Sequence, residues 1–397
     1  MTAPAHHGRI GVAFLIRSLN RGGAERQLAT LAGGLDPEAF DVTVLTFYPG
    51  GPVWDELQQC PSVRLRSLSK TGRWDVLGFS RRLRTALKQV RPHILHCYMT
   101  EPSIFGLLVG RVTRIPAIVW GIRASNMDLA AYGAVHEVSF KLMAGLSRFA
   151  DLIIGNSESG RRHHLQRGFS PRAFVTIPNG IDTDRFRPSA AHRRAARAAW
   201  GIEEDDIVVG VAARLDPMKG YPVLLRAAAG VLRQCPRVRF VCLGGGPAAY
   251  QTEFRQMAEA LGIGACVLWL GECGDMPSLY PGFDIACSSS VFGEGFSNSI
   301  AEAMACAIPC VVTDVGDSGR IVGDTGLVVP PADPDALTEA ILALVRSGAE
   351  ARGALGRRAR ARIVSSFGVR IMIERTSACY RMLIPDPGVV QTSRWRS

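Results

Sequence analysis

The sequence predicts an α/β protein made of two doubly wound, parallel-sheet (Rossmann-like) domains that face a cleft. Apolar runs of strand length alternate with helical segments along almost the whole 397-residue chain, which indicates parallel sheets covered by helices on both faces. A polar, Ala/Arg-rich stretch near residues 185–200 interrupts this alternation, which then starts again. A chain of this length can bury two sizeable cores, so we place a domain boundary at the interruption.

The first half alternates short apolar runs with helical periodicity. Strands are expected at 9–16, 42–47, 63–68, 94–96, 117–120, 152–154 and 175–177, and helices after residue 23 and at 74–90 and 102–112. A longer helix follows residue 126, and one stripe of it is apolar: Val135, Val138, Leu142, Leu146 and Phe149. Its helical spacing favours packing against the core rather than contact with a membrane.

The second half repeats the pattern after the turn residues 178–182. Strands are expected at 207–212, 239–243, 267–270, 283–287 and 310–313, and helices at 221–235, 248–262, 298–308, 334–347 and 350–366. We therefore assign 1–183 to an N-terminal domain and 184–367 to a C-terminal domain. Residues 386–397 are expected to form a flexible tail.

The amino-acid composition limits the classes of protein to which this chain can belong. Apolar residues make up 47% of the chain and charged residues 20%, as in globular proteins. No apolar run is long enough to cross a bilayer and no signal-peptide pattern opens the sequence, so we expect a cytoplasmic location. The ten cysteines form no CxxC pair, which indicates reduced thiols and neither a disulfide framework nor a metal site.

The formal net charge of +11 is carried almost wholly by arginine. It indicates either an anionic partner, such as a diphosphate or a lipid surface at the inner face of the membrane, or an arginine-rich proteome. Nucleic acid is disfavoured, because the basic clusters lack interleaved aromatic residues and no nucleic-acid-binding motif is present.

The most informative stretch is 291–319, which reads as loop, helix and strand. Glu294 lies in a glycine-bracketed loop after a strand, where doubly wound sheets bind ligands. Glu302 lies near the start of a helix capped by Ser297 and Asn298, whose positive end favours an anion. Each carboxylate alone could be a solvated or dipole-complementing charge, but together with the glycines they indicate a site for a sugar diphosphate.

Arg214 and Lys219 are the second strong feature. Both follow a strand end, five positions apart, in a loop with turn residues Asp216 and Gly220. Two cations in such a loop can neutralise a diphosphate as it leaves. A solvated loop is the alternative.

Two further signals are weaker. Gly22 and Gly23 open a helix after the first strand, which would let main-chain N–H groups approach an anion, or would simply make a tight turn. The dinucleotide motif GxGxxG is absent from this strand end, which disfavours a Rossmann oxidoreductase. Asp182 and Asp184 match a metal-binding DxD, but three residues are a very weak signal.

Several motifs occur together in order: GGAE at 22–25, PNGID at 178–182, Arg214 with Lys219 and Gly220, GGGP at 244–247, EGFSNSIAEAM at 294–304 and GLVVPP at 326–331. The chain resembles the retaining glycosyltransferases of family 4 (glycosyl transferases group 1), which have the GT-B fold. The resemblance covers nearly the whole chain. It implies hexosyltransferase-type transfer of a sugar from a nucleoside-diphosphate sugar, with retention and with no metal or cofactor. It also implies that the last helix, about 368–385, crosses back onto the first domain.

The resemblance also implies roles for single residues. Arg214 and Lys219 correspond to the diphosphate-binding pair, Glu302 to the residue that binds the ribose, and Glu294 to the residue that contacts the donor sugar. The remaining donor-binding positions are Gly22, Gly23, Gly244, Glu272, Cys273, Gly295, Phe296 and Ser297. Glu272 and Cys273 fall where the family holds the base through main-chain contacts.

One position departs from the family. Many members carry a histidine in the loop after the strand at 117–120, and Arg123 occupies roughly that place here. Arginine cannot act as a base at neutral pH, but it can stabilise developing charge or position the acceptor. We therefore count Arg123 among the catalytic candidates and, together with His96, Ser125 and Asn126, among the acceptor candidates.

Two rival functions remain at this stage: a nucleotide-sugar epimerase of the same fold, and a non-catalytic nucleotide-sugar-binding subunit. The presence of both glutamates and both cations disfavours each of them. Within the transferase reading we favour a UDP-sugar donor and a lipid-linked or polysaccharide-precursor acceptor, because the basic N-terminal half suits an anionic membrane surface. The base, the sugar, the acceptor and the oligomeric state are not fixed by the sequence.

Overall fold

The computed structural model describes residues 8–72, 74–123 and 134–385. These residues divide into two compact units: unit 1 contains the described residues up to Gly180 together with those from Val369 on, and unit 2 contains Ile181–Gly368. The contact boundary thus falls three residues before the boundary placed from the sequence. The segment 386–397 and the acceptor candidates Ser125 and Asn126 lie outside the described residues.

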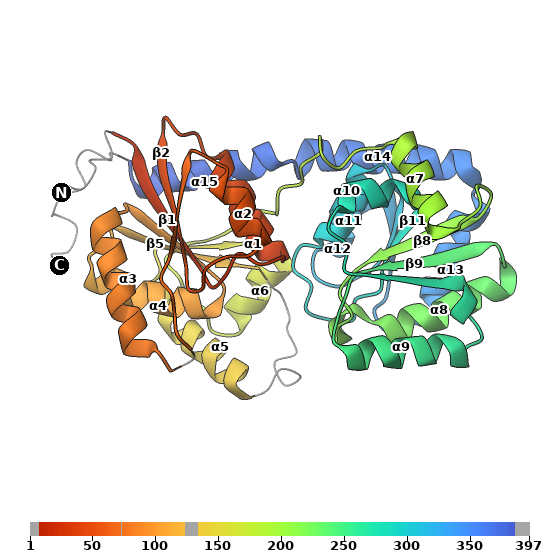
Figure 1. The fold of residues 1–397 in the computed structure, drawn as a ribbon, viewed down its shortest axis with the longest axis horizontal. Coiled ribbons are helices and arrows are strands. Elements are labelled where there is room, and N and C mark those ends of the chain that lie inside the picture. Colours follow the sequence, from red (N-terminus) through yellow and green to blue (C-terminus); the bar gives the residue numbers. More distant parts are fainter. Residues whose placement is uncertain (1–7, 73, 124–133, 386–397) are drawn as a thin grey trace. The chain divides into compact units, whose positions relative to one another are not determined.

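Unit 1 is built on a seven-stranded, wholly parallel sheet in the order β3-β2-β1-β4-β5-β6-β7 (Figure 1). Its strands are β1 (Ile10–Ile16), β2 (Phe40–Thr46), β3 (Val63–Ser67), β4 (Ile94–Tyr98), β5 (Ala117–Ile122), β6 (Leu152–Gly155) and β7 (Phe174–Thr176). The central strands are continuous buried runs, as expected for a sheet covered on both faces.

Helices cover both faces of the unit 1 sheet. The first core lies beneath α1 (Gly23–Gly34), α2 (Pro52–Gln58) and α15 (Val369–Leu383), and α15 packs against α1. The second core lies beneath α3 (Val76–Val90), α4 (Thr100–Val112) and α5 (Ala134–Leu146), with α6 (Glu158–Gln166) following β6.

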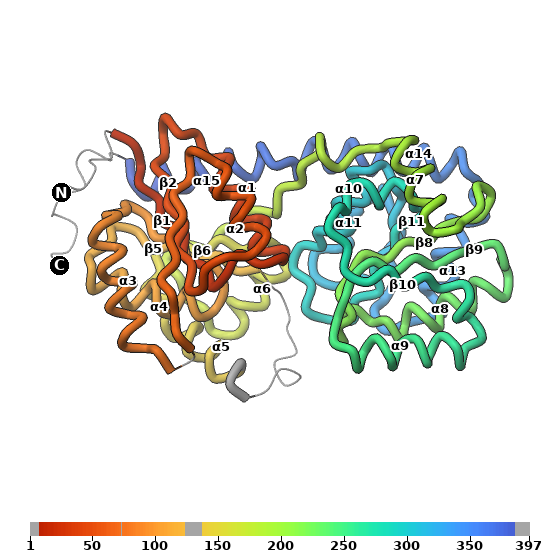
Figure 2. Tube along the Cα trace, in the orientation of Figure 1, coloured from red at the N-terminus to blue at the C-terminus, as the bar shows by residue number. Residues whose placement is uncertain are grey.

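Unit 2 has a six-stranded parallel sheet in the order β10-β9-β8-β11-β12-β13. Its strands are β8 (Ile207–Ala212), β9 (Val238–Leu243), β10 (Val267–Gly271), β11 (Ile285–Ser288), β12 (Cys310–Thr313) and β13 (Gly326–Val329). One face is covered by α8 (Tyr221–Gln234), α9 (Ala248–Ala260) and α13 (Pro334–Arg346). The other is covered by α7 (Ala190–Trp200), α11 (Asn298–Ala305), α12 (Ser318–Val322) and α14 (Gly348–Ser366), with the short α10 (Met276–Leu279) nearby. The Cα trace in Figure 2 shows the strand–helix alternation of each unit.

The predicted fold class is confirmed: each unit is a doubly wound α/β layer structure. None of the described helices has both the length and the apolar character that a membrane-spanning helix needs.

The prediction that the apolar stripe of the long helix faces the core is wrong for three of its five residues. Val138, Leu142 and Phe149 are 66, 49 and 48% exposed. Leu146 of the stripe does pack against the core, together with Phe140, Met143 and Ala144, which are not part of the stripe, and the side chain of Val135 is not described. Periodicity identifies an apolar stripe but does not say what covers it, and α5 is apolar on more than one side.

Candidate donor-binding site

Three loops at the carboxyl ends of adjacent unit 2 strands are joined by main-chain hydrogen bonds. The N–H of Leu215 donates to the carbonyl of Gly245 at 2.9 Å, which joins the loops after β8 and β9. The N–H of Gly244 donates to the carbonyl of Gly271 at 2.7 Å, which joins the loops after β9 and β10. The loops therefore form one connected surface at the sheet edge where this class of fold binds ligands.

Glycine is required where these loops approach one another most closely. Gly244 has φ +139°, and a Cβ there would lie 2.1 Å from the carbonyl oxygen of Ala213. Gly220 has φ +63°, and its Cβ would lie 2.1 Å from the carbonyl oxygen of Ser289. A side chain at either position would force the main chain apart. These two glycines fix the shape of the loop that carries the predicted cations.

Lys219 is the last residue of a short 3-10 turn, Pro217–Lys219, which hydrogen bonds hold on two sides. The carboxylate of Asp216 accepts from the N–H of Met218 at 3.1 Å. The hydroxyl of Ser289 donates to the carbonyl of Lys219 at 2.8 Å, and the N–H of Val291 donates to the carbonyl of Met218 at 2.8 Å. The Lys219 side chain is only 16% exposed, so its ammonium group has a defined position.

The structure brings Lys219 into direct contact with Glu294. Lys219 Nζ forms an ion pair with Glu294 Oε1, and the Glu294 side chain is 8% exposed. The hydroxyl of Ser290 donates to the same oxygen at 2.8 Å. The loop of Glu294 is clamped in turn, because the N–H of Asp317 donates to the carbonyl of Gly295 at 3.0 Å. Two predicted site residues that are 75 positions apart in the chain therefore form one charge pair.

Arg214 differs from Lys219 in its environment. Its side chain is 73% exposed, and a guanidinium nitrogen lies 3.5 Å from the Asp216 carboxylate. An exposed pair of this kind holds its members only weakly. Arg214 is thus an accessible cation on the same loop as the enclosed Lys219.

Glu302 is half-buried on α11. The hydroxyl of Tyr280 donates to Glu302 Oε2 at 2.9 Å. Burial, with the Glu302 charge as a second cause, raises the pKa of Tyr280 well above its ordinary value, so the phenol stays a neutral donor. No sequence pattern indicated Tyr280 as a site residue; it lies 22 positions before Glu302 in the chain. Ser297 stands at the N-cap of α11 as predicted, but its side chain makes no capping hydrogen bond.

The other donor-binding candidates differ in what they can offer. Glu272 is exposed, whereas Cys273 is half-buried, with its Sγ 3.6 Å from the Gly271 carbonyl. Burial, and next the Glu272 charge, raise the pKa of the Cys273 thiol. Phe296 is 5% exposed and lies against Phe367, with ring centroids 5.5 Å apart. Its side chain belongs to the core, so only its main chain can contact a ligand.

The unit 1 candidates lie at the carboxyl end of the other sheet. Helix α1 begins at Gly23, with Gly22 at its N-cap, and Glu25 lies so close that a Cβ on Gly22 would be 2.1 Å from its carboxylate. Arg123 follows β5 and donates to the hydroxyl of Tyr98 at 2.7 Å and to Oδ1 of Asn179 at 3.0 Å.

His96 differs from Arg123, the other acceptor candidate that the structure describes, in its burial. Its side chain is fully buried in β4, and its Nδ1 lies 2.6 Å from the hydroxyl of Tyr380 on α15. Burial, and next the Arg123 charge, lower the pKa of His96 well below its ordinary value. The role of His96 as an acceptor residue therefore stays a prediction, and in this structure its side chain is buried within unit 1.

No group of three or more His, Cys, Asp or Glu side chains suited to hold a metal ion occurs among residues 8–72, 74–123 and 134–385. The DxD candidate makes a turn instead. Oδ1 of Asp182 accepts from the N–H groups of Asp184 and Arg185 at 3.1 and 3.0 Å. The Asp182 carboxylate therefore stabilises a turn by accepting main-chain hydrogen bonds.

Two family models match the chain. The model for "Glycosyltransferase Family 4" matches residues 21–185, and the model for "Glycosyl transferases group 1" matches residues 206–347. Together they cover most of both units. The chain belongs to the family 4 glycosyltransferases. It is accordingly an enzyme of the hexosyltransferase type.

The chain is also similar to individual glycosyltransferases. It is 26% identical over 312 residues to the putative glycosyltransferase EpsF of Bacillus subtilis, covering 76% of this chain and 79% of that protein. It is 36% identical over 202 residues to the D-inositol 3-phosphate glycosyltransferase of Saccharomonospora viridis, covering 48% of this chain. That match spans 46%, about half, of the relative's own length.

The crystal structure of HepE from Anabaena in complex with UDP-glucose superposes with a TM-score of 0.82. The superposition covers 94% of this chain and all of that one, at 22% sequence identity. It shows that the family 4 transferase has the GT-B fold that the resemblance implied.

Proposed function

We propose that this glycosyltransferase moves a sugar from a nucleoside-diphosphate sugar to an acceptor hydroxyl, with retention of anomeric configuration and without a metal ion. The observation that carries the proposal is the enclosed Lys219, which shares the carboxyl edge of the unit 2 sheet with the exposed Arg214 and the start of α11. These positive groups can take up the charge of a diphosphate.

The chemistry follows from where the charge develops. The bond between C1 of the sugar and the phosphate oxygen breaks, and its electron pair stays on the diphosphate. Lys219 and Arg214 stabilise that charge, which otherwise would need a metal ion. The acceptor oxygen forms its bond to C1 on the same face, and its proton passes to the phosphate oxygen that has just left. In this scheme no protein side chain has to act as the base.

We favour a UDP-sugar as the donor. HepE, whose fold this chain shares, has been crystallised with UDP and with UDP-glucose. Glu302, held by Tyr280, supplies a carboxylate oxygen that can accept from two adjacent ribose hydroxyls.

A donor screen tests the proposal. Release of the nucleotide from UDP-, GDP- and ADP-sugars should be fastest for a UDP-sugar and should continue after metal chelation. Lys219→Ala should slow it by about 10²-fold, by analogy with the removal of one preorganised charge-stabilising donor. Retention should appear in the anomeric configuration of the product by NMR. Unchanged turnover in Lys219→Ala, or a requirement for Mg²⁺, would exclude this mechanism.

We further propose that the acceptor is lipid-linked or a polysaccharide precursor, and that unit 1 works against an anionic membrane surface. Ten of the thirteen large apolar side chains that are exposed within the described residues lie between Trp74 and Leu165. Apolar groups gathered on one region of a surface mark an interaction site.

The α4–α5 patch is the clearest part of this region. It consists of the exposed residues Leu108, Val112, Val138, Leu142 and Phe149. Basic side chains lie beside them in the sequence: Lys141 precedes Leu142 and pairs with Glu137 at 2.8 Å, and the Arg148 guanidinium carbon is 4.9 Å from the centroid of the Phe149 ring. Apolar residues interleaved with cations suit an anionic lipid surface, and like charges disfavour pairing of two copies through this patch.

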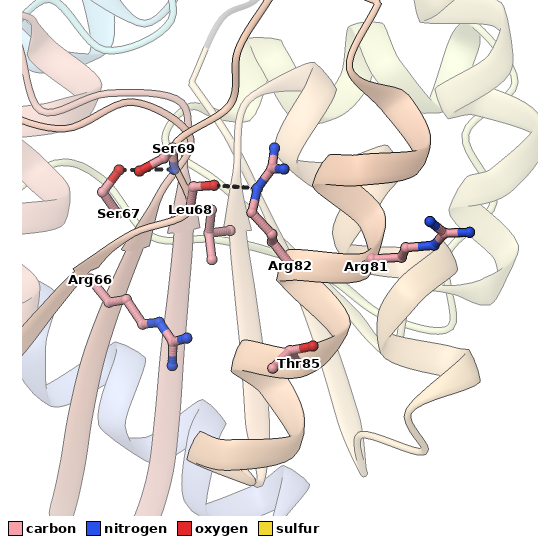
Figure 3. A pocket seen from close by; sticks show the side chains of 7 residues that line it. All are labelled: Arg66, Ser67, Leu68, Ser69, Arg81, Arg82 and Thr85. Carbon is pink, nitrogen blue, oxygen red and sulfur yellow. Dashed lines mark hydrogen bonds between the residues drawn. The ribbon is translucent and has the colours of Figure 1, made fainter.

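The neighbouring helix α3 adds charge. Its basic residues contribute to a small open cavity of about 260 Å³ beside the end of β3, lined by Arg66, Ser67, Leu68, Ser69, Arg81, Arg82 and Thr85 (Figure 3). Arg82 is structural, since its Nε donates to the Leu68 carbonyl at 2.8 Å and its guanidinium pairs with Asp75. Arg81 points away from the other lining residues (Figure 3) and is exposed.

Vesicle sedimentation tests the membrane proposal. The protein should bind vesicles containing phosphatidylglycerol more than pure phosphatidylcholine vesicles. Leu142→Ser with Phe149→Ser should reduce binding, and so should Arg81→Gln with Arg84→Gln, which changes two exposed arginines of α3. The control Val364→Ser, at an exposed apolar residue of α14 in unit 2, should not reduce it. Equal binding by all variants would refute the assignment of this face.

A further inference from the structure

The charge of Arg123 is not neutralised by any carboxylate among the residues that the structure describes. Its two terminal nitrogens donate to Asn179 Oδ1 at 3.0 Å and to the Tyr98 hydroxyl at 2.7 Å, both neutral groups. Its Nε is buried and has no hydrogen-bond partner within that part of the chain. A guanidinium group is charged at every physiological pH, so this position carries a positive charge that no carboxylate of residues 8–72, 74–123 and 134–385 offsets.

The guanidinium is also held in place. Its central carbon lies 4.6 Å from the centroid of the Tyr98 ring, a cation–π contact. The turn that carries Asn179 is fixed by Gln27 of α1, which donates to the Gly180 carbonyl and accepts from the Gly180 N–H, both at 2.9 Å. A group fixed by its own unit before a ligand arrives loses little entropy on binding.

Polar atoms without partners lie on the strands at either side of β5. Nε2 of His96 in β4 is buried and unpartnered within the described residues, and so is Oδ1 of Asn156, which directly follows β6. The two side chains are 0 and 3% exposed. Buried polar atoms are nearly always hydrogen-bonded, so several buried polar atoms without a partner near one strand indicate that a ligand or a water molecule binds there.

Other buried and partly buried arginines of the chain are held in two ways. Arg111 pairs with Asp151 at 2.8 Å, and Arg193 and Arg197 pair with Asp284 at 2.7 and 3.0 Å. Arg352 and Arg360 donate to main-chain carbonyls instead, whereas Arg123 is held by two neutral side chains. A partly buried charge without a counter-ion is costly, and the cost is recovered when an anion binds.

We propose that Arg123 binds an anionic substituent of the substrate, a carboxylate or a phosphate carried by the sugar or by the acceptor. Arg123 is thereby the residue that sets the specificity of unit 1 for a charged substrate. This inference rests on the proposed transferase function. Each terminal nitrogen of the guanidinium keeps one N–H beyond its present hydrogen bond, and paired N–H groups suit carboxylate and phosphate oxygens. Tyr98 and Asn179 are positioning residues for this contact.

The test compares charged and neutral members of matched pairs. One arm offers UDP-glucuronate and UDP-glucose as donors, and the other offers glucose 6-phosphate and glucose as acceptors. Each arm is run with wild type, Arg123→Gln and Arg123→Lys, and with Arg162→Gln, an exposed arginine of α6, as the control. Binding of the two donors and of the two acceptors is measured by calorimetry alongside turnover, and thermal melting checks folding.

We expect wild type to prefer the charged member of one pair. Arg123→Gln should lower kcat/KM for that member by about 10-fold to 100-fold, the range of a charge-assisted hydrogen bond, and should lower kcat/KM for the neutral member by a smaller factor. Arg123→Lys should retain part of the preference, and Tyr98→Phe should weaken it while leaving the charge in place. The arm that responds identifies whether the sugar or the acceptor carries the anion.

The inference is overturned if wild type shows no charge preference in binding or turnover, or if Arg123→Gln affects both members of each pair equally. The proposed function fails in a different way, when UDP does not bind at unit 2 and no UDP-sugar is turned over. Calorimetry separates the two failures, because it reads the charge preference without turnover.

Discussion

Replacing Glu294 by glutamine should tighten the binding of free UDP while it slows turnover. Lys219, the enclosed cation of the candidate site, is engaged by Glu294 in the absence of ligand. A diphosphate must therefore share or displace this carboxylate before it gains the full attraction of Lys219. The glutamine keeps the size of the side chain and an acceptor oxygen for Ser290, but it removes the competing charge.

The size of the effect follows from the enclosure of the pair, whose side chains are 16 and 8% exposed. Two unit charges about 4 Å apart attract by about 4 kcal/mol at an effective dielectric of about 20. Desolvation offsets part of this, and the amide oxygen still accepts a hydrogen bond. We therefore expect UDP binding to gain about one third of this attraction, about 1.4 kcal/mol, when the charge of Glu294 is removed. This energy corresponds to a factor of about 10 in the Kd of UDP. Turnover should fall by about 10²-fold if Glu294 contacts the reacting sugar as expected.

Calorimetric titration of UDP, with a parallel donor-hydrolysis assay, measures both quantities. Ser290→Ala is a control for the loss of a hydrogen bond to Glu294 without loss of its charge, and it should leave UDP affinity within about 3-fold of wild type. Unfolding by urea checks that the variants are equally folded. If Glu294→Gln bound UDP as wild type does, or more weakly, then the ion pair would not oppose the diphosphate and the reasoning would be refuted.

The sequence was sufficient to predict the sheets, because parallel strands buried on both faces appear as continuous apolar runs. The runs at 9–16 and 310–313 became β1 and β12 almost residue for residue. The exposed stripe of α5 could not be predicted in this way. A helical stripe has the same spacing whether a sheet or a solvent-exposed surface faces it, so Val138 and Leu142 were assigned to the wrong environment.

The candidate site was predictable only where a residue type and a strand end coincided. Arg214, Lys219 and Glu294 were found because charged groups beside glycines at the end of an apolar run are unusual. The contact between Lys219 and Glu294 could not be predicted, because it joins the loops after two different strands, β8 and β11. Tyr280 was missed for the same reason: an aromatic residue between apolar neighbours resembles any core residue until its hydroxyl is located.

Three further predictions concern the supports of the site and of the fold. Tyr280→Phe should raise the KM for the donor about 2- to 10-fold with little change in kcat, because Glu302 loses a hydrogen bond of about 0.5–1.5 kcal/mol; steady-state kinetics with one UDP-sugar would show it. Gly220→Ala should lower the free energy of unfolding in urea by more than about 1 kcal/mol and weaken UDP binding, since its Cβ would lie 2.1 Å from a main-chain oxygen at φ +63°; an unchanged midpoint would contradict the geometry. The last prediction is a loss of stability in acid. Burial and Arg123 lower the pKa of His96, and burial lowers the pKa of His164 to about 4, so neither native imidazole takes up a proton just below pH 6.5. The unfolded chain does take up protons there, so the contribution of these two histidines to the free energy of unfolding should be constant above about pH 7 and should fall as the pH drops below about 6.5, by about 1.4 kcal/mol per pH unit for each histidine. The matched variant His96→Gln should show a shallower decline between pH 6.5 and 5, and identical slopes for the two proteins would mean that His96 is protonated in the native state.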